Sequence, residues 1–470
     1  MPPLPGKSTG DTPGPLESPG LPNPFAAWFA GRGWTPHPHQ LALLAAARAG
    51  RSTLLIAPTG GGKTLAGFLP SLVALASATG GQAGLDTLYI SPLKALAVDI
   101  HRNLEQPIAE MGLAVTAETR TGDTPQAKRA RQRKTPPHLL LTTPESLALM
   151  LSYADAAQMF ARLRTVVVDE VHAIAGNKRG DLLALSLARL RHLAPQCRVS
   201  GLSATVAFPD QLAQWLGSGG RPVEIIQGAG ARDAEIAILK TSERMPWGGR
   251  MALFSIPDVY KAIKGAGTTL VFVNTRAQAE LVFQALWRIN DDNLAIALHH
   301  GSLAVEQRRK VEGAMARGSL RAVIATSSLD LGVDWAAVDL VLQVGAPKGA
   351  SRLVQRVGRA NHRLDVPSRA LLVPANRFEV LECRAAIDAV AEGTLDGDPP
   401  RSGALDVLAQ HLMGTACSEP FEQDAMYAQV AACQPYAGLS RKDFHILNQP
   451  YDRRTYFALT AKLMKDLGIK

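Results

Sequence analysis

Cysteine is scarce in this sequence, with four cysteines among 470 residues. They are scattered along the chain, and no two of them form a Cys-x-x-Cys pair. Disulfide frameworks and cysteine-ligated zinc sites need paired or clustered cysteines, so this spacing argues against both and indicates a reducing compartment. The four are Cys197, Cys383, Cys417 and Cys433.

Long apolar runs are missing as well. No stretch of apolar residues is long enough to span a bilayer, and the N-terminus has no basic start followed by an apolar core. We therefore expect no membrane-spanning helix, no signal peptide, no membrane partner and a cytoplasmic location.

Acidic residues are outnumbered by basic ones. Lys and Arg together number 50 against 41 Asp and Glu, which gives a net charge of +9 and a sequence pI near 9.5. Such a balance is typical of proteins that bind nucleic acid, but an ordinary basic enzyme is at least as compatible with it.

Short apolar runs alternate with helical segments through most of the chain. This alternation predicts parallel α/β sheets covered by helices on both faces. The pattern pauses in a Gly-rich polar interval and then restarts, so two sheets are expected. The predicted strands lie at 52–56, 87–91, 138–143, 165–169, 198–202 and 223–227, and then at 269–274, 294–299, 322–326, 340–344 and 369–373.

These patterns divide the chain into five parts. A Pro-, Gly- and Ser-rich tail is predicted to be disordered at 1–24, and a linker is predicted at 229–250. The two α/β domains are expected at 25–228 and 251–395, followed by a small, mostly helical region at 396–470.

A strand, a Gly-rich turn and a helix start follow one another in STLLIAPTGGGKT, residues 52–64. Backbone N–H groups of such a turn can surround a triphosphate, and the helix N-terminus adds its positive end. Lys63 would reach the β- and γ-phosphates, and the Thr64 hydroxyl would hold Mg²⁺. Ala57 stands where the usual pattern has glycine, and a turn that binds nothing is the less favoured alternative.

Adjacent carboxylates follow the predicted buried strand in TVVVDEVH, residues 165–172. Asp169 would anchor Mg²⁺, and Glu170 would orient and deprotonate an attacking water. Such a pair also occurs in plain turns, so this segment alone favours the turn.

Hydroxyls, a backbone turn or a helix N-terminus lie beyond a predicted strand or helix in SPLKALAVD (91–99), RTGDTP (120–125) and TTPESL (142–147). Hydroxyls and helix N-termini at a sheet edge suit a sugar–phosphate backbone. The basic run KRARQRK (128–134) is expected to be a solvated helix face, with nucleic-acid contact as the second interpretation.

The second predicted sheet carries VFVNTR (271–276), HHGSL (299–303), ATSSLDLGVDW (325–335) and QRVGRANHR (355–363). The last is the most informative, because a domain without its own P-loop has no evident need for clustered Gln and Arg on a helix. An arginine supplied across a cleft to a γ-phosphate is such a need, while a surface cluster that pairs with acids is the alternative.

Taken in order, these segments resemble the motifs of superfamily 2 helicases, and most closely the Lhr-type DExH helicases of the ligase-associated group. The likeness covers about 25–444 and includes TPHPHQ (35–40), DEVHAIAGNKRGD (169–181), SAT (203–205) and RSGALDVLAQHLMG (401–414). It implies two RecA-like parallel-sheet domains in tandem, followed by a partial winged-helix region, with ATP between the domains.

The resemblance assigns roles to residues at matching positions. Gln40 would read the adenine, and the ATP-binding set would be Thr59, Gly60, Gly61, Gly62, Lys63, Thr64, Asp330 and Gly332. His172, Ser203 and Thr205 would couple hydrolysis to movement. Glu170, Gln355 and Arg359 would act on the γ-phosphate, with Arg356 as a second candidate. Asn361 and His362 depart from the common pattern and leave the role of Arg363 open.

The expected nucleic-acid contacts come from both sheets: Pro92, Lys94, Thr121, Gly122, Thr143 and Pro144 in the first, and Asn274, Thr275, Arg276 and Thr326 in the second.

The function implied is ATP- and Mg²⁺-dependent 3′→5′ translocation on single-stranded DNA with unwinding, possible repair work beside a ligase or nuclease, and association with the nucleoid. An RNA or hybrid helicase and an ATP-gated clamp with little turnover stay open as alternatives. Relatives continue further, so this C-terminally shortened chain is expected to hydrolyse ATP but unwind weakly.

Overall fold

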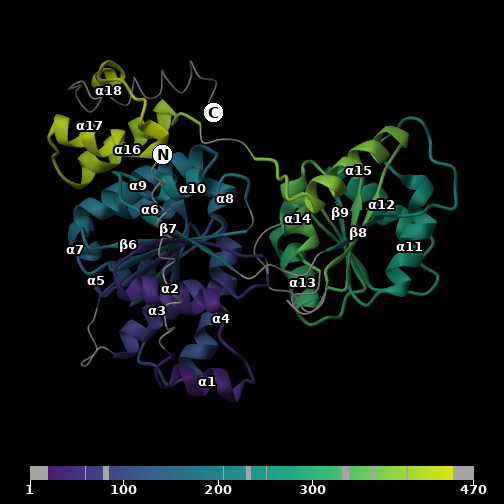
Figure 1. The fold of residues 1–470 in the computed structure, drawn as a ribbon, viewed down its shortest axis with the longest axis horizontal. Helices are drawn as coiled ribbons and strands as arrows, with labels where there is room; N and C mark the ends of the chain where they lie inside the picture. The colour runs from purple at the N-terminus through teal and green to yellow at the C-terminus, as the bar shows by residue number, and fades with distance from the viewer. Residues whose placement is uncertain are drawn as a thin grey trace, which may run out of the picture.

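The computed structural model describes residues 20–58, 60–77, 84–204, 206–228, 234–249, 251–330, 338–360, 367–397 and 401–447. Two α/β bodies lie side by side, and the helices that end the described chain lie against the first (Figure 1). Several predicted features lie outside the described residues: most of the tail, parts of the linker and of the C-terminal region, and Thr59, Thr205, Gly332, Asn361, His362 and Arg363.

The first sheet has seven strands in the order β3-β4-β2-β5-β6-β1-β7, and every pair is parallel. The central strands are short aliphatic runs buried on both faces, as expected for a sheet between helix layers. Their bounds are β1 Ser52–Ile56, β2 Thr87–Ile90, β3 Ala117–Arg120, β4 Leu139–Thr142, β5 Thr165–Val168, β6 Arg198–Ser203 and β7 Val223–Gln227.

Helices cover both faces of this sheet, and several begin where the sequence supplies a cap. Thr143 caps one helix by accepting from the Ser146 backbone N–H, and Pro144 occupies the first helical position. The helices are α1 Phe25–Gly31, α2 Pro38–Arg48, α3 Lys63–Ser77, α4 Lys94–Glu110, α5 Gln126–Lys134, α6 Pro144–Leu151, α7 Ala156–Phe160, α8 Val171–Ile174, α9 Lys178–Leu193 and α10 Pro209–Leu216.

The basic run is helix α5, and its arginines contact the protein itself. Arg131 lies 2.6 Å from Glu118, and Arg133 lies 2.9 Å from Asp155. Arg129 donates to the carbonyls of Thr121 and Gly122. This helix therefore has an ion-paired surface face, which agrees with the first interpretation of the run.

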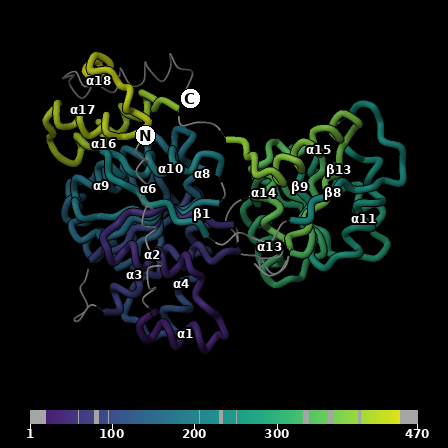
Figure 2. Tube along the Cα trace, in the orientation of Figure 1, coloured from purple at the N-terminus to yellow at the C-terminus, as the bar shows by residue number. Residues whose placement is uncertain are grey.

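The second sheet has six strands in the order β10-β11-β9-β12-β13-β8, also all parallel. Figure 2 traces this separate body in green. The strands are β8 Glu235–Ile238, β9 Thr269–Val273, β10 Ile296–His299, β11 Ala322–Ala325, β12 Leu340–Val344 and β13 Arg369–Val373. Around them lie η1 Leu253–Ser255, α11 Ile256–Gly265, α12 Arg276–Arg288, α13 Val305–Ala316, η2 Ser327–Leu329, α14 Ala350–Val357 and α15 Arg377–Ala391.

The predicted linker at 229–250 is wrong where it includes β8. This strand pairs with β13 and forms an edge of the second sheet. Its sequence EIAI alternates between exposed and half-buried positions. The edge position explains why it carries no continuous apolar run and lacks the signal of a buried strand.

The last described helices pack on the first body. They are α16 Leu405–Ser418, α17 Gln423–Ala431, η3 Gln434–Tyr436 and α18 Arg441–Leu447, and their apolar side chains share one core with α6, α9 and α10. Buried Asp181 on α9 accepts from the Ala404 N–H at 3.0 Å and from Arg401 at 3.2 Å. His411 on α16 is buried as well, and burial lowers its pKa to about 4, so its imidazole is neutral at neutral pH. The region is therefore joined to the first body as one packed unit.

Among the described residues, no helix is both long and apolar enough to cross a membrane.

Candidate active site

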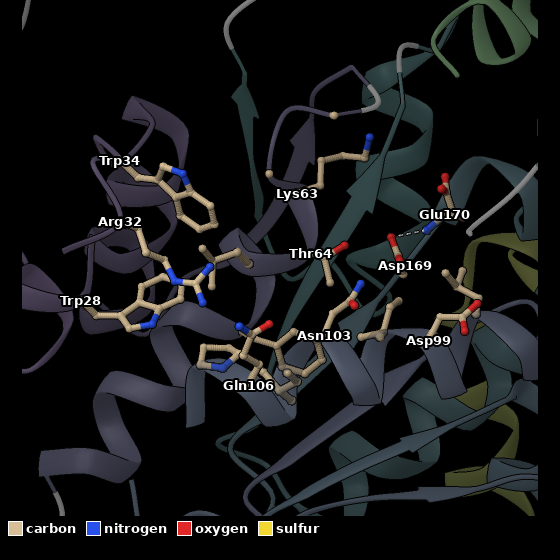
Figure 3. Close-up of a pocket in the computed structure, with 18 of the residues that line it drawn as sticks. Trp28, Arg32, Trp34, Lys63, Thr64, Asp99, Asn103, Gln106, Asp169 and Glu170 are labelled. Carbon is tan, nitrogen blue, oxygen red and sulfur yellow. Dashed lines mark hydrogen bonds between the residues drawn. The ribbon is translucent and has the colours of Figure 1, made fainter. Parts of the chain in front are cut away.

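A cavity of about 530 Å³ is lined by four of the predicted ATP-binding residues, namely Gly60, Gly62, Lys63 and Thr64. The phosphate-loop residues and the two adjacent acids lie toward one end, and Trp28, Arg32 and Trp34 lie toward the other (Figure 3). Arg359 from the second body also lines it. The cavity is thus built from both α/β bodies.

The Gly-rich turn has the conformation that its glycines allow. Gly60 and Gly62 have φ values of 77° and 68°, which disfavour larger residues, and α3 begins at Lys63. The Lys63 ammonium donates to the carbonyls of Ala57 at 2.9 Å and Pro58 at 3.0 Å. Burial lowers its pKa, although Glu170 and Asp169 oppose that shift.

Ala57 is accommodated by a glycine far along the chain. Gly228 donates its N–H to the carbonyl of Ile56, next to Ala57. A Cβ added at Gly228 would lie 2.5 Å from the Cβ of Ala57. The departure from the usual glycine at 57 therefore depends on the absence of a side chain at 228.

The start of α2 holds the Gly-rich turn from the side. His39 Nε2 lies 2.7 Å from the Gly61 carbonyl, and Gln40 Nε2 lies 3.4 Å from the Gly62 carbonyl. The side-chain Oε1 of Gln40 accepts from the His37 backbone N–H at 2.9 Å. Gln40 is therefore buried against the phosphate loop, and His39 is a contact that motif reading missed.

The two acids lie where β5 ends, beside β2. Asp169 accepts from the Glu170 N–H at 2.8 Å and from the Tyr89 hydroxyl. Burial raises the pKa of Asp169, and the neighbouring Glu170 adds to the shift. Glu170 has φ 48° and ψ 46°, a left-handed conformation that non-glycine residues adopt at a cost of roughly 1–2 kcal/mol. Strain of this kind is concentrated at functional sites.

His172 connects the acids to the next strand. Its Nδ1 lies 3.0 Å from Ser203 Oγ, and its Nε2 lies 3.5 Å from Glu170. Burial lowers the pKa of His172. The predicted coupling residues His172 and Ser203 are thus in direct contact.

The two arginine candidates on and after α14 have different surroundings. Arg356 is 2% exposed, binds Asp330 at 2.8 Å and Gln343 at 2.5 Å, and lies over the Phe272 ring. Arg359 donates to the Asp330 carbonyl at 2.8 Å and lines the cavity with Lys63 and the acids. Arg356 is therefore held inside its own domain, whereas Arg359 faces the other one.

Five of the expected γ-phosphate and ATP residues in the described part of the chain are not among the cavity-lining residues: Gln40, Gly61, Asp330, Gln355 and Arg356. Gln355 lies half-buried on α14, and the Asp330 side chain is occupied by Arg356. Asp330 accordingly positions the arginines in this structure.

The far end of the cavity is formed by residues that motif reading missed. The Arg32 guanidinium lies 4.9 Å from the Trp28 ring centre and 5.0 Å from that of Trp34. Glu110 accepts from Arg32 at 2.5 Å and from the Trp28 indole at 2.7 Å, and these bonds lower its pKa to about 2. Two tryptophans and an arginine within seven residues are the sequence feature that could have indicated this end of the cavity. Flat rings and a guanidinium can stack on a nucleotide base.

The predicted nucleic-acid residues of the first body form one edge. Lys94 lies 2.8 Å from Asp123, in the turn that also contains Thr121 and Gly122. Arg179 donates to the Pro92 carbonyl at 2.7 Å and pairs with Glu145, which lies in the first turn of α6 beside Thr143 and Pro144. These contacts join the turns that follow β2, β3 and β4.

The corresponding edge of the second body is also tied together. Asn274 donates to the Ala346 carbonyl at 2.8 Å, and Thr275 caps α12 directly before Arg276. Thr326 precedes η2, whose Ser328 lies 2.9 Å from His299. The motifs of this sheet therefore meet at the carboxyl ends of its strands.

Comparisons with known proteins agree with this arrangement. Residues 37–212 match the DEAD/DEAH box helicase family, 255–363 the helicase conserved C-terminal domain, and 388–449 the winged helix domain of the large helicase-related protein. The first two segments cover β1 to β6 of the first sheet and β9 to β12 of the second, and the third covers the helices packed on the first body.

The chain belongs to the Lhr-type DExH helicases of superfamily 2.

Relatives of this Lhr-type chain include a protein of Mycolicibacterium smegmatis named Lhr helicase/probable uracil glycosylase, 37% identical, with 93% of this chain and 32% of the relative aligned. The ATP-dependent helicase Lhr-Core of Methanocaldococcus jannaschii is 35% identical, over 90% of this chain and 52% of the relative. The solved structure of Mycobacterium smegmatis helicase Lhr bound to ssDNA and AMP-PNP matches with a TM-score of 0.79 and 38% identity, over 90% of this chain and 56% of that one. The chain thus spans between about a third and a little over half of the length of these relatives.

Proposed function

We propose that this chain is an ATP-dependent nucleic-acid translocase and helicase that acts on single-stranded DNA. One observation carries the proposal: a single cavity brings the phosphate loop and the Asp–Glu pair of the first domain together with Arg359 of the second. A site divided in this way can respond to anything that moves the two domains, including a strand bound across both.

The phosphate loop would bind the triphosphate. The Lys63 ammonium now donates to two loop carbonyls, and phosphate oxygens would replace these acceptors. Trp34 and Arg32 would flank the base, while Gln40 supports the loop from behind.

Thr64 and Asp169 would hold Mg²⁺. Their hydroxyl and carboxylate oxygens line the same cavity, and Mg²⁺ commonly binds one or two protein oxygens together with phosphates and water. Among the described residues no group of three or more His, Cys, Asp and Glu could hold a metal without such help. When bound, the ion would neutralise charge on the β- and γ-phosphates.

Hydrolysis would use Glu170 and Arg359. The Glu170 carboxylate would take the proton of an attacking water, and its left-handed backbone would aim it into the cavity. The Arg359 guanidinium would stabilise the charge on the transferred phosphoryl group once the domains close. The His172–Ser203 contact would then report the state of Glu170 to β6.

Nucleic acid would lie across the two strand edges described above. Hydroxyls, backbone groups and Lys94 there can contact phosphates and sugars without reading bases. By family resemblance we assign 3′→5′ movement, a role in DNA repair and partners of the ligase or nuclease type.

ATP turnover with and without single-stranded DNA tests the proposed function. We expect DNA to stimulate turnover whatever its base sequence. The affinity for single-stranded DNA should fall with salt, and a plot of log affinity against log salt concentration should have a slope of about −0.7 for each phosphate neutralised. Single-stranded RNA of the same length is the comparison for substrate class. Nucleotide-dependent DNA binding without turnover would favour a clamp, and a flat salt response would contradict a backbone-tracking motor.

A further inference from the structure

Tyr89 is a buried residue that none of the roles above uses. It lies in β2, whose four residues TLYI are all buried, and its side chain is completely shielded from solvent. A phenol hydroxyl taken out of water needs a hydrogen-bond partner, because an unpaired buried donor is destabilising. The partner of Tyr89 is the carboxylate of Asp169.

The sheet register places these two groups together. β2 pairs with β5 so that Tyr89 lies opposite Val167, and the Asp169 N–H donates to the Ile90 carbonyl at 2.9 Å. The Asp169 carboxylate therefore receives one bond from its own strand's continuation, the Glu170 N–H, and one from the neighbouring strand, the Tyr89 hydroxyl.

The Tyr89 ring is itself held by the helix that carries the phosphate loop. It stacks on Phe68 with ring centres 4.8 Å apart and an angle of 17° between the planes. Phe68 lies four residues after Thr64 on α3, so both lie on one face of the helix, and both line the cavity. Phe68, Tyr89 and Asp169 thus form a continuous path from α3 to the end of β5.

We propose that Tyr89 is a positioning residue for Asp169. Its hydroxyl holds one oxygen of the Asp169 carboxylate and so fixes the orientation of that carboxylate in the cavity that Thr64 also lines, where the two residues would hold Mg²⁺ with the nucleotide. The inference rests on the proposed function, because it assumes that Asp169 serves Mg²⁺-bound nucleotide.

Nucleotide binding, measured with a fluorescent ADP analogue over a range of Mg²⁺ concentrations, tests the inference in the full chain. Tyr89→Phe keeps the ring and its stack on Phe68 and removes the hydroxyl. We expect the Mg²⁺ midpoint to rise about 10-fold to 100-fold, as when outer partners of metal ligands are removed, while affinity without Mg²⁺ stays unchanged. If the hydrogen bond only stabilised the fold, its loss would change nucleotide affinity alike with and without Mg²⁺.

Two further variants make the result specific. Tyr436→Phe removes another buried tyrosine hydroxyl, which donates to the Ala404 carbonyl away from the cavity, and should leave the Mg²⁺ midpoint unchanged. In an Asp169→Asn background, Tyr89→Phe should have no additional effect on the midpoint.

The outcomes separate the two proposals. A wild-type midpoint in Tyr89→Phe, or an additive effect with Asp169→Asn, would overturn the role of Tyr89 and leave the proposed function intact. Wild-type protein that binds the nucleotide without any response to Mg²⁺ would remove both.

Discussion

Replacing Arg359 with alanine is expected to lower ATP turnover about 10³-fold, as arginine fingers do, while ATP binding changes little. Arg359 lines the cavity from the second domain, whereas Lys63, Thr64 and the acids that would bind the ground state belong to the first. Steady-state turnover together with nucleotide titration measures the two effects. Turnover close to that of the wild type would contradict a site shared by the domains.

Arg356→Ala is the matched control for Arg359. Arg356 lies in the last turn of α14, and Arg359 lies just after the helix ends. Arg356 is buried against the side chains of Asp330 and Gln343. Removing it leaves the Asp330 carboxylate buried and unpaired by its main partner, at a cost of about 3–5 kcal/mol in stability. Thermal unfolding should therefore expose a defect in Arg356→Ala that Arg359→Ala lacks.

Glu170→Gln is expected to lower ATP turnover by about 10²-fold to 10⁴-fold and to leave nucleotide affinity unchanged or higher. The amide cannot accept the proton of the attacking water, while the phosphate loop and the Thr64–Asp169 pair stay in place. Lys63→Ala should differ, because it removes a ground-state phosphate contact and lowers affinity as well. Single-turnover hydrolysis of pre-bound ATP distinguishes a chemical defect from a binding defect.

Glu110→Gln is the control variant for Glu170→Gln, because it changes another glutamate near the cavity in the same way. Glu110 lies beyond the other end of the cavity, where it pairs with Arg32 and Trp28. Its replacement should raise the ATP concentration needed for half-maximal turnover and spare the maximal rate. If Glu170→Gln kept the maximal turnover of the wild type, Glu170 would not be the general base.

The sequence predicted most of both sheets because their buried strands are continuous aliphatic runs. β3, with the sequence AETR, was missed because it is half-buried and polar, and β8 was missed as an alternating edge strand. Edge strands need only one apolar face, so their signal is weaker than that of β2 or β5.

The site was predictable where chemistry is local in sequence. The phosphate loop and the adjacent acids each occupy one short segment, so their residue types and order were enough. The preference for Arg359 over Arg356 came from the family resemblance alone, because only contacts with Phe272 and Gln343, distant in sequence, show which arginine is held. Tyr89 was missed for the same reason, since its partner lies 80 residues away.

Domain closure is the central claim, and a distance between the domains tests it most directly. Glu105 on α4 and Gln307 on α13 are exposed, and the two helices lie on facing sides of the bodies (Figure 1). Both can be changed to cysteine and spin-labelled in a Cys417→Ser background, which removes the exposed natural thiol among the described cysteines. The account predicts a shorter and narrower distance distribution when single-stranded DNA and a non-hydrolysable ATP analogue are added together. A distribution unchanged by both ligands would contradict it.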